Sequence, residues 1–340
     1  ILLPKSRDPE ESPLDPGGAI LSTIGVVALV YALIEAPEVG WLSTTTLVAF
    51  AVSAVFLIAF VLYEHRAKDP MVDMAYFRNP AFSTSTGCMI LVFLSMYGIA
   101  FLITQYLQLV QGYSAVGAAL RVAPTAVLMV IVGPQTPRLS ARLGANRAVA
   151  VGMSMAALAL FTFTTLERTS SYVHLLIPFC VFSFGIGLTM SPMTAAIMSA
   201  VPPRRAGAGS AMNDATRELG AALGVAVLGS VVATHYSHSV AAAANASLTG
   251  SAASEAKSSI ASALDQAKTL PANAGKALTA AADHAFLGGM HIAAIAAGVL
   301  SAVAAVLVLR YLPHTLRHRS GEPATELNDG EMLAMDVPLA

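Results

Sequence analysis

Long apolar stretches separated by short polar segments dominate the chain. An α-helix rises 1.5 Å per residue, so about 20 apolar residues cross the ~30 Å hydrocarbon core of a bilayer. Several of the stretches end in turn-forming residues, such as Asn79-Pro80. The pattern therefore predicts eight transmembrane helices, at about residues 17–36, 43–63, 81–108, 115–135, 147–166, 173–199, 206–235 and 285–312.

Composition points to an all-α integral membrane protein. Of the 340 residues, 56% are hydrophobic and 11% are charged, whereas soluble domains carry about 25% charged residues. The net charge of −1 argues against nucleic-acid binding, which needs a basic stripe. Cys88 and Cys180 lie inside apolar stretches, which excludes a disulfide scaffold and a thiolate metal site. The motifs G-x-S-x-G, H-E-x-x-H and G-x-x-x-x-G-K are absent, so we expect neither an enzyme nor a cofactor.

The Lys and Arg residues are distributed unequally between the loops. Of these 19 residues, 14 fall on one side of the predicted membrane and five on the other. Because positive residues favour the cytoplasmic side, we expect both ends of this chain in the cytoplasm. The abundance of arginine over lysine fits a GC-rich bacterial genome, so we expect a bacterial cytoplasmic membrane. The first residue is Ile1, and we expect the chain to be a fragment of a longer polypeptide.

Two segments outside the predicted spans are long. Residues 236–284 are rich in Ala and Ser and would form an outer loop, within which Ile260, Leu264 and Ala267 have the spacing of a short amphipathic helix. This loop is either an external cap on a pathway or a tolerated surface insertion, and we favour the insertion. Residues 313–340 are acidic and lack an apolar period, which predicts a disordered cytoplasmic tail.

Amide and soft apolar side chains within the spans are candidates for lining a pathway. Gln105, Gln108 and Gln111 are spaced by three and would share one face of the third span. Because amides are costly against lipid, this face either lines a pathway or forms interhelical hydrogen bonds. Such a lining suits flat lipophilic molecules, since methionine tolerates varied shapes. The other candidates are Met96, Tyr97, Met190 and Asn213.

Charged residues near the ends of the spans are candidates for gating. Asp214 precedes Arg217 and Glu218 by three and four residues at the start of the seventh span, so the three lie on one helix face. They form either an inner gate that switches ion pairs or a local charge network at the headgroup boundary. Arg121 lies near the outer end of the fourth span. We interpret His291, about two turns into the eighth span, as a hydrogen-bonded packing residue rather than a proton carrier.

Glycines predict where helices approach closely. Gly220 and Gly224 form a G-x-x-x-G pattern, which lets the backbone of a second helix come near. Gly185 and Gly187, between two prolines of the sixth span, predict bending or packing points. We therefore expect Gly224→Leu to lower the amount of folded protein, and we expect Gly250→Leu in the outer loop to leave it unchanged.

Four groups of residues resemble the fourteen-helix drug:proton antiporters, the EmrB/QacA-type branch of the major facilitator superfamily. The first group is Arg7-Asp8-Pro9, Leu14-Asp15, Gly17, Tyr31-Ala32-Leu33-Ile34-Glu35 and Gly40-Trp41. The second is Tyr106-Leu107-Gln108-Leu109-Val110-Gln111-Gly112-Tyr113-Ser114 with Gly117, Leu120-Arg121 and Pro124. The third is Gly133-Pro134 with Arg138-Leu139-Ser140-Ala141-Arg142-Leu143-Gly144. The fourth is Gly209-Ser210-Ala211-Met212-Asn213 with Arg217-Glu218-Leu219-Gly220-Ala221-Ala222-Leu223-Gly224-Val225-Ala226-Val227.

The resemblance implies a fold for this chain. The eight spans would be helices seven to fourteen of that branch. Residues 1–80 would form a cytoplasmic connector with two extra helices, and residues 81–312 a six-helix C-terminal bundle with a 3+3 inverted repeat. Arg138, Arg142 and Gly144 would belong to a cytoplasmic loop motif, but Ala141 stands where the family often has an acid. That departure puts a gate closed by the acid in doubt.

The resemblance also implies a function. It implies proton-coupled efflux of drugs or other amphipathic small molecules, with the proton gradient as the energy source. The partners would be the lipid bilayer, the substrate, and an N-terminal bundle of the same polypeptide that holds the proton-coupling residues. The alternative within transport is a dedicated exporter of one metabolite, antibiotic or lipid. A channel and a membrane-embedded enzyme are the alternatives from other classes.

Overall fold

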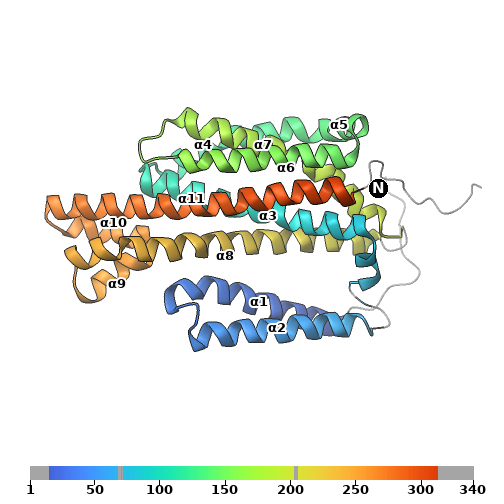
Figure 1. Ribbon diagram of the computed structural model, residues 1–340, viewed down its shortest axis with the longest axis horizontal. Coiled ribbons are helices and arrows are strands. Elements are labelled where there is room, and N and C mark those ends of the chain that lie inside the picture. Colours follow the sequence, from blue (N-terminus) through green and yellow to red (C-terminus); the bar gives the residue numbers. More distant parts are fainter. Residues whose placement is uncertain (1–14, 68–69, 71, 203–205, 313–340) are drawn as a thin grey trace, which may run out of the picture.

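The computed structural model describes residues 15–67, 70, 72–202 and 206–312. Every regular element in those residues is a helix (Figure 1). In chain order they are α1 (Pro16–Val39), α2 (Thr44–Glu64), η1 (Met74–Arg78), α3 (Pro80–Gln105), η2 (Tyr106–Val110), α4 (Ala115–Val132), η3 (Gly133–Gln135), α5 (Thr136–Leu143), α6 (Ala145–Thr162), η4 (Phe163–Thr165), α7 (Tyr172–Ser199), α8 (Ala206–Ser247), α9 (Gly250–Ser258), α10 (Ile260–Thr269) and α11 (Ala272–Tyr311).

The eight predicted spans are confirmed within the described part of the chain. Eight helices there are long and apolar enough to cross a membrane, and each overlaps one predicted stretch. Their starts follow from local capping chemistry. The carboxylate of Asp15 accepts a hydrogen bond from the Gly18 amide at 2.9 Å, and the hydroxyl of Ser114 accepts one from the Gly117 amide at 3.1 Å. Such caps satisfy amide groups that the first turn of a helix leaves without partners.

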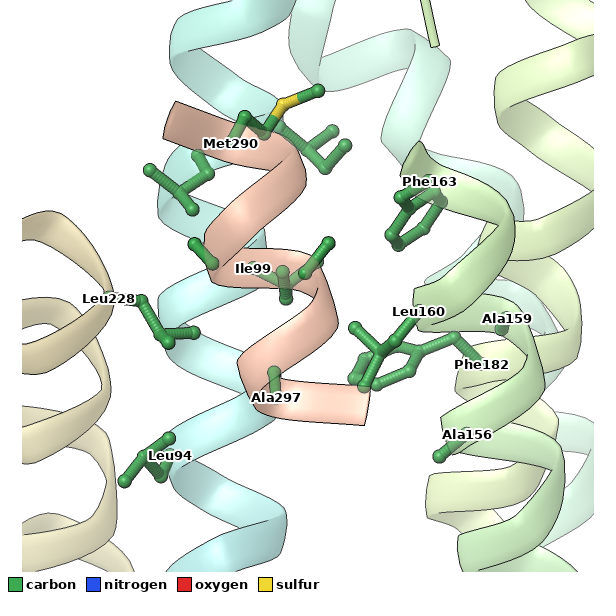
Figure 2. Packing of buried hydrophobic residues seen from close by; sticks show 14 of the residues in the cluster. Leu94, Ile99, Ala156, Ala159, Leu160, Phe163, Phe182, Leu228, Met290 and Ala297 are labelled. Carbon is green, nitrogen blue, oxygen red and sulfur yellow. The ribbon is translucent and has the colours of Figure 1, made fainter. Parts of the chain in front are cut away.

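The central element is α11, which lies between α8 on one side and α6 on the other (Figure 1). Alanines recur along the faces of α11 that these neighbours cover, including Ala293, Ala297 and Ala304, all fully buried. Lipid is as apolar as these side chains, so close packing of small residues holds the helices together. Figure 2 shows Met290 and Ala297 on α11, with Leu228 of α8 to one side of this helix and Leu160 of α6 to the other.

The helices α1 and α2 pair with each other and contact the rest of the protein mainly through α8 (Figure 1). The hydrophobic side chains on their outer surfaces are exposed, among them Val27 at 61% and Val55 at 63%. The indole of Trp41, in the turn between the two helices, donates a hydrogen bond to the Thr234 hydroxyl of α8 at 3.2 Å. The pair is therefore attached along one side and leaves apolar surface free on the other.

The segment expected to join the last two spans is mostly helical. The helix α8 continues past residue 235 to Ser247 and α11 begins at Ala272, so most of residues 236–284 is helical. The reason is that alanine has the highest helix propensity, while hydropathy alone ends a span at the first polar run. The short amphipathic helix expected there is confirmed as α10, whose Ile260 and Ala267 are buried. The predicted tail 313–340 and the first connector residues lie outside the described residues.

Candidate functional site

A cavity of about 350 Å³ lies between α1, α3 and α8, next to the α9–α10 junction. This volume falls within the range of small-molecule sites, roughly 300–1,000 Å³. Sixteen residues line it: Ile34, Pro37, Phe101, Leu102, Gln105, Val225, Ala226, Gly229, Ser230, Val232, Ala233, Tyr236, Ser258, Ser259, Ile260 and Phe286. None of them is acidic, basic or histidine, so the wall is largely apolar with a few neutral polar groups.

Gln105 is the one predicted pathway residue in this lining. It ends the α-helical part of α3, where it is half-buried. Its side-chain amide makes no hydrogen bond to any other described residue. An amide that faces a cavity without a protein partner can bind a ligand, because both its donor and its acceptor remain free.

The three glutamines do not share one environment. The chain leaves the α-helical register at the π turn η2, so the spacing by three no longer places the amides on one face. Gln108 is half-buried inside that turn and does not line the cavity. The Gln111 amide donates hydrogen bonds to the Tyr106 hydroxyl at 2.7 Å and to the Ser170 carbonyl at 3.0 Å. Gln111 therefore ties the α3–α4 junction to the α6–α7 connection.

Arg217 lies in a second group of side chains, contributed by α3, α7 and α8. Its guanidinium lies 5.3 Å from the centroid of the Phe93 ring, 3.8 Å from the Met190 sulfur and 3.8 Å from the carboxylate of Asp214. The exposed ring of Tyr97 stacks on Phe93 with centroids 6.0 Å apart. A cation held against aromatic and sulfur surface is a stable arrangement that needs no interhelical ion pair.

The remaining candidates near this group differ in exposure. Asn213 is 6% exposed and its side-chain oxygen accepts a hydrogen bond from the Thr194 hydroxyl at 3.5 Å. Glu218 is exposed, and Met96 packs against the hydrophobic core. The ion pair of Asp214 with Arg217 joins two residues of the same helix, and both side chains reach solvent or lipid. None of these residues lines the cavity.

Arg121 holds α4 against α7. Its guanidinium lies over the Tyr113 ring, 3.5 Å from the centroid, and donates a hydrogen bond to the Gly117 carbonyl at 3.0 Å. The hydroxyl of Tyr172 donates to the Arg121 carbonyl at 3.0 Å. By contrast, Arg138 is exposed on α5 and makes no ion pair or hydrogen bond to another described residue.

The turn after α5 depends on glycine. Gly144 ends α5 with φ +86°, a left-handed value that other residues rarely adopt, and it directly precedes α6. Arg142 lies two residues earlier, in the last turn of α5, and is exposed. The loop-motif arginines therefore stand at one exposed corner of the protein, and the glycine sets the direction of the chain there.

The predicted packing glycines lie at helix contacts. A Cβ at Gly220 would lie 2.7 Å from the Ile90 carbonyl oxygen of α3, and a Cβ at Gly224 would contact the Leu94 backbone. Gly185 of α7 faces the Gly152 backbone of α6 in the same way. Gly187 is less tight, with its nearest neighbour a Val132 side-chain carbon at 3.2 Å.

Two ionisable residues of α11, Asp283 and His291, contact the connection between α6 and α7. Asp283 lies in the helix and not in a loop; it is 3% exposed, and its carboxylate forms an ion pair with the Arg168 guanidinium at 3.2 Å. His291 is half-buried midway along α11 rather than near its start, and its Nε2 lies 2.9 Å from the Leu166 carbonyl oxygen. Both contacts join α11 to the α6–α7 connection. The sequence signal that could have identified Asp283 is an acidic residue inside an Ala-rich segment that favours helix.

Comparison with known proteins places the chain in a family. The family model described as Major Facilitator Superfamily matches residues 17–225. The chain is 36% identical over 219 residues to the multidrug resistance protein Stp of Mycobacterium tuberculosis, covering 64% of this chain and 41% of Stp. It is 31% identical over 307 residues to the multidrug efflux pump LfrA of Mycolicibacterium smegmatis, covering 90% of this chain and 60% of LfrA. The tetracenomycin C resistance and export protein of Streptomyces glaucescens is 30% identical over 300 residues, covering 87% of this chain and 56% of that protein.

The chain thus spans about half the length of the curated relatives that it matches. Eight apolar helices in the described residues and the match to a transporter family make it a multi-pass membrane protein. The family match covers more than half of the chain and includes all of α3 and the first part of α8, the two helices that supply most of the cavity wall. The chain belongs to the Major Facilitator Superfamily.

Proposed function

We propose that this chain is part of a proton-coupled exporter of drugs or other amphipathic small molecules. The observation that carries the proposal is the cavity between α3 and α8, whose wall is apolar and free of charge in a chain of a transporter family. Such a wall can bind lipophilic molecules of different shapes. Relatives named as multidrug resistance and multidrug efflux proteins support the same function.

The proposal assigns proton coupling mainly to an N-terminal bundle of the full-length polypeptide. The two ionisable residues of α11 described above already have partners, since Asp283 pairs with Arg168 and His291 contacts the Leu166 carbonyl. A group that carries protons must change its charge during transport, and a group held in a structural contact resists that change. The proposal also takes α1 and α2 as the two extra helices and α3 to α11 as the six-helix bundle.

A dedicated exporter of one compound is the second candidate. It is favoured by the relative named tetracenomycin C resistance and export protein, which aligns with 87% of this chain. The single amide in the cavity wall, Gln105, also fits recognition of one particular polar group. A broad and a narrow exporter share the same cavity and differ in how many compounds they move.

Efflux from intact cells tests the function. Cells that express the full-length polypeptide are expected to extrude a preloaded lipophilic dye several-fold faster than cells with an empty vector. Addition of a proton uncoupler is expected to abolish the difference, because an antiporter draws its energy from the proton gradient. Efflux that continues at the same rate after the gradient has collapsed would contradict proton coupling. A panel of unrelated dyes separates the broad exporter from the narrow one.

The orientation in the membrane gives a second expected result. We propose a bacterial cytoplasmic membrane with both ends of this chain in the cytoplasm, from the bias of Lys and Arg between the loops. A reporter fused after Arg147 is expected to report the cytoplasm, whereas one inserted at Ser262, in α10, is expected to report the outside. A cytoplasmic signal from the Ser262 insertion would contradict this orientation.

A further inference from the structure

The cavity next to the α9–α10 junction has no charged group in its wall. All sixteen lining residues are neutral, and eleven of them are apolar or glycine. Asp283 lies one turn before the lining residue Phe286 on α11, but its carboxylate is already paired with Arg168. Moving a compact permanent cation, such as an alkylammonium group, from water into a site without a free countercharge is strongly unfavourable. The wall therefore selects uncharged molecules.

Most of the polar groups in the wall are already engaged by the protein. The hydroxyl of Tyr236 donates to the carbonyls of Ala256 and Ser259, at 3.0 and 3.2 Å. The hydroxyl of Ser230 donates to the Val227 carbonyl at 2.9 Å. The Tyr236 bonds fix the α9–α10 junction on α8, and in both hydroxyls the single donor is already used.

The two serines at the α9–α10 junction are engaged in the same way. The Ser258 hydroxyl donates to the Glu255 carbonyl at 2.9 Å. The Ser259 hydroxyl accepts a bond from the Ser262 amide at 3.1 Å and lies 2.9 Å from the Ser262 hydroxyl. Among the polar lining residues, Gln105 alone makes no hydrogen bond to another described residue. Its donor and its acceptor are therefore both free to orient a ligand.

The shape of the wall depends on Gly229. A Cβ at this position would lie 3.7 Å from the Phe101 ring, an ordinary contact, so Gly229 is not required for helix packing. The absence of a side chain there leaves room next to the Phe101 ring, in a wall that also includes the ring of Phe286. Aromatic surface of this kind binds flat apolar molecules through large contact areas.

We propose that this cavity binds uncharged, mostly hydrocarbon molecules that carry one hydrogen-bonding group, with Gln105 as the residue that orients them. Compact permanent cations are excluded from it. The inference rests on the proposed function only in taking the bound molecule to be one that the protein exports. Binding itself follows from the wall and takes place without a proton gradient.

Equilibrium binding to the purified full-length polypeptide in lipid nanodiscs tests the inference. The neutral probe is N-phenyl-1-naphthylamine, a flat amine whose N–H can donate to the Gln105 carbonyl, and its fluorescence is corrected with empty nanodiscs. Benzyltrimethylammonium, whose charge lies on a compact ammonium group, serves as the permanently charged competitor. We expect saturable binding of the neutral probe and no displacement by the cation. Displacement at similar concentrations would overturn the exclusion of cations.

Variants of the wall locate the binding. Gly229→Leu fills the cavity and is expected to weaken binding of the neutral probe by about tenfold or more, because the ligand loses its contact surface. Gln105→Leu removes the hydrogen bond and is expected to weaken it by about two- to tenfold. The matched control is Gly87→Leu on α3, where an added Cβ has no atom within 4 Å. It is expected to bind as the unmodified protein does.

If Gly229→Leu folds poorly, a second variant that fills the cavity can replace it in the test. Ala233→Leu adds bulk to another part of the same wall and is expected to weaken binding to a similar extent. Monodisperse protein in which both variants bind the probe normally would overturn the inference. If these variants lose binding but the cells show no uncoupler-sensitive efflux, the cavity is supported and the proposed function fails. If the cells show such efflux but the variants bind the probe normally, the proposed function stands and the cavity is not the binding site.

Discussion

Replacing Gly224 with leucine is expected to remove most of the folded protein from the membrane. A Cβ at this position would contact the Leu94 carbonyl oxygen and lie 2.9 Å from the Leu94 Cα. On the facing helix, a Cβ at Gly98 would lie 2.6 Å from the Gly224 carbonyl oxygen. Both contacts are with backbone, which cannot rotate away as a side chain can. The overlap is relieved only if α3 and α8 move apart.

The expected cost is about 3 kcal/mol or more, at the upper end for overpacking, because a whole helix interface must shift. The measurement is the yield of monodisperse protein after detergent extraction, together with its thermal midpoint. Gly87→Leu on α3 is the matched control, since nothing lies within 4 Å of its added Cβ. Similar yields of the two variants would show that α3 and α8 do not pack this closely.

The structure also changes the control that the sequence suggests. Gly250 makes no close contact, and nothing lies within 4 Å of a Cβ built there. Its φ of +60° is nevertheless left-handed, so a leucine at this position is strained whatever the space around it. Gly250→Leu is therefore expected to carry a cost of its own and is not a neutral comparison for Gly224→Leu.

Removing Arg168 is expected to destabilise the protein more than neutralising its partner Asp283. The Asp283 side chain is 4% exposed, and both of its carboxylate oxygens are buried without a hydrogen bond, so the ion pair to Arg168 is their compensation. Arg168→Ala leaves this carboxylate buried and unpaired, at a cost of about 3 kcal/mol. The Arg168 side chain is 55% exposed, so little packing is lost with it.

Asp283→Asn removes the charge and keeps the shape, so its expected cost is about 1 kcal/mol. The variant Arg168→Ala with Asp283→Asn is expected to be more stable than Arg168→Ala alone, because no buried charge is left. Thermal unfolding of the purified full-length polypeptide and its three variants measures this order. An Arg168→Ala variant as stable as Asp283→Asn would mean that Asp283 finds compensation elsewhere.

The packing of α3 against α8 and the cavity between them differ in how far the sequence predicts them. The G-x-x-x-G pattern at Gly220 and Gly224 identifies a close approach because the requirement for small residues is local. The cavity needs residues of α1, α3, α8, α10 and α11 together with the α9–α10 junction, and no local pattern assembles such a set. Of the seven pathway residues proposed from amides, aromatics and methionines, Gln105 alone lines it.

By itself, the sequence determined the eight spans, the all-helical class and the resemblance to a transporter family. Crossing a bilayer is a condition on the length and hydropathy of one segment, so it can be counted along the chain. The tertiary structure decided the environment of each glutamine and the pairing of Asp283 with Arg168. These features depend on contacts between distant residues, such as that of Gln111 with Ser170, 59 positions apart. Which distant segments meet is fixed by the packing of the whole helix bundle, and that information is not contained in any single stretch.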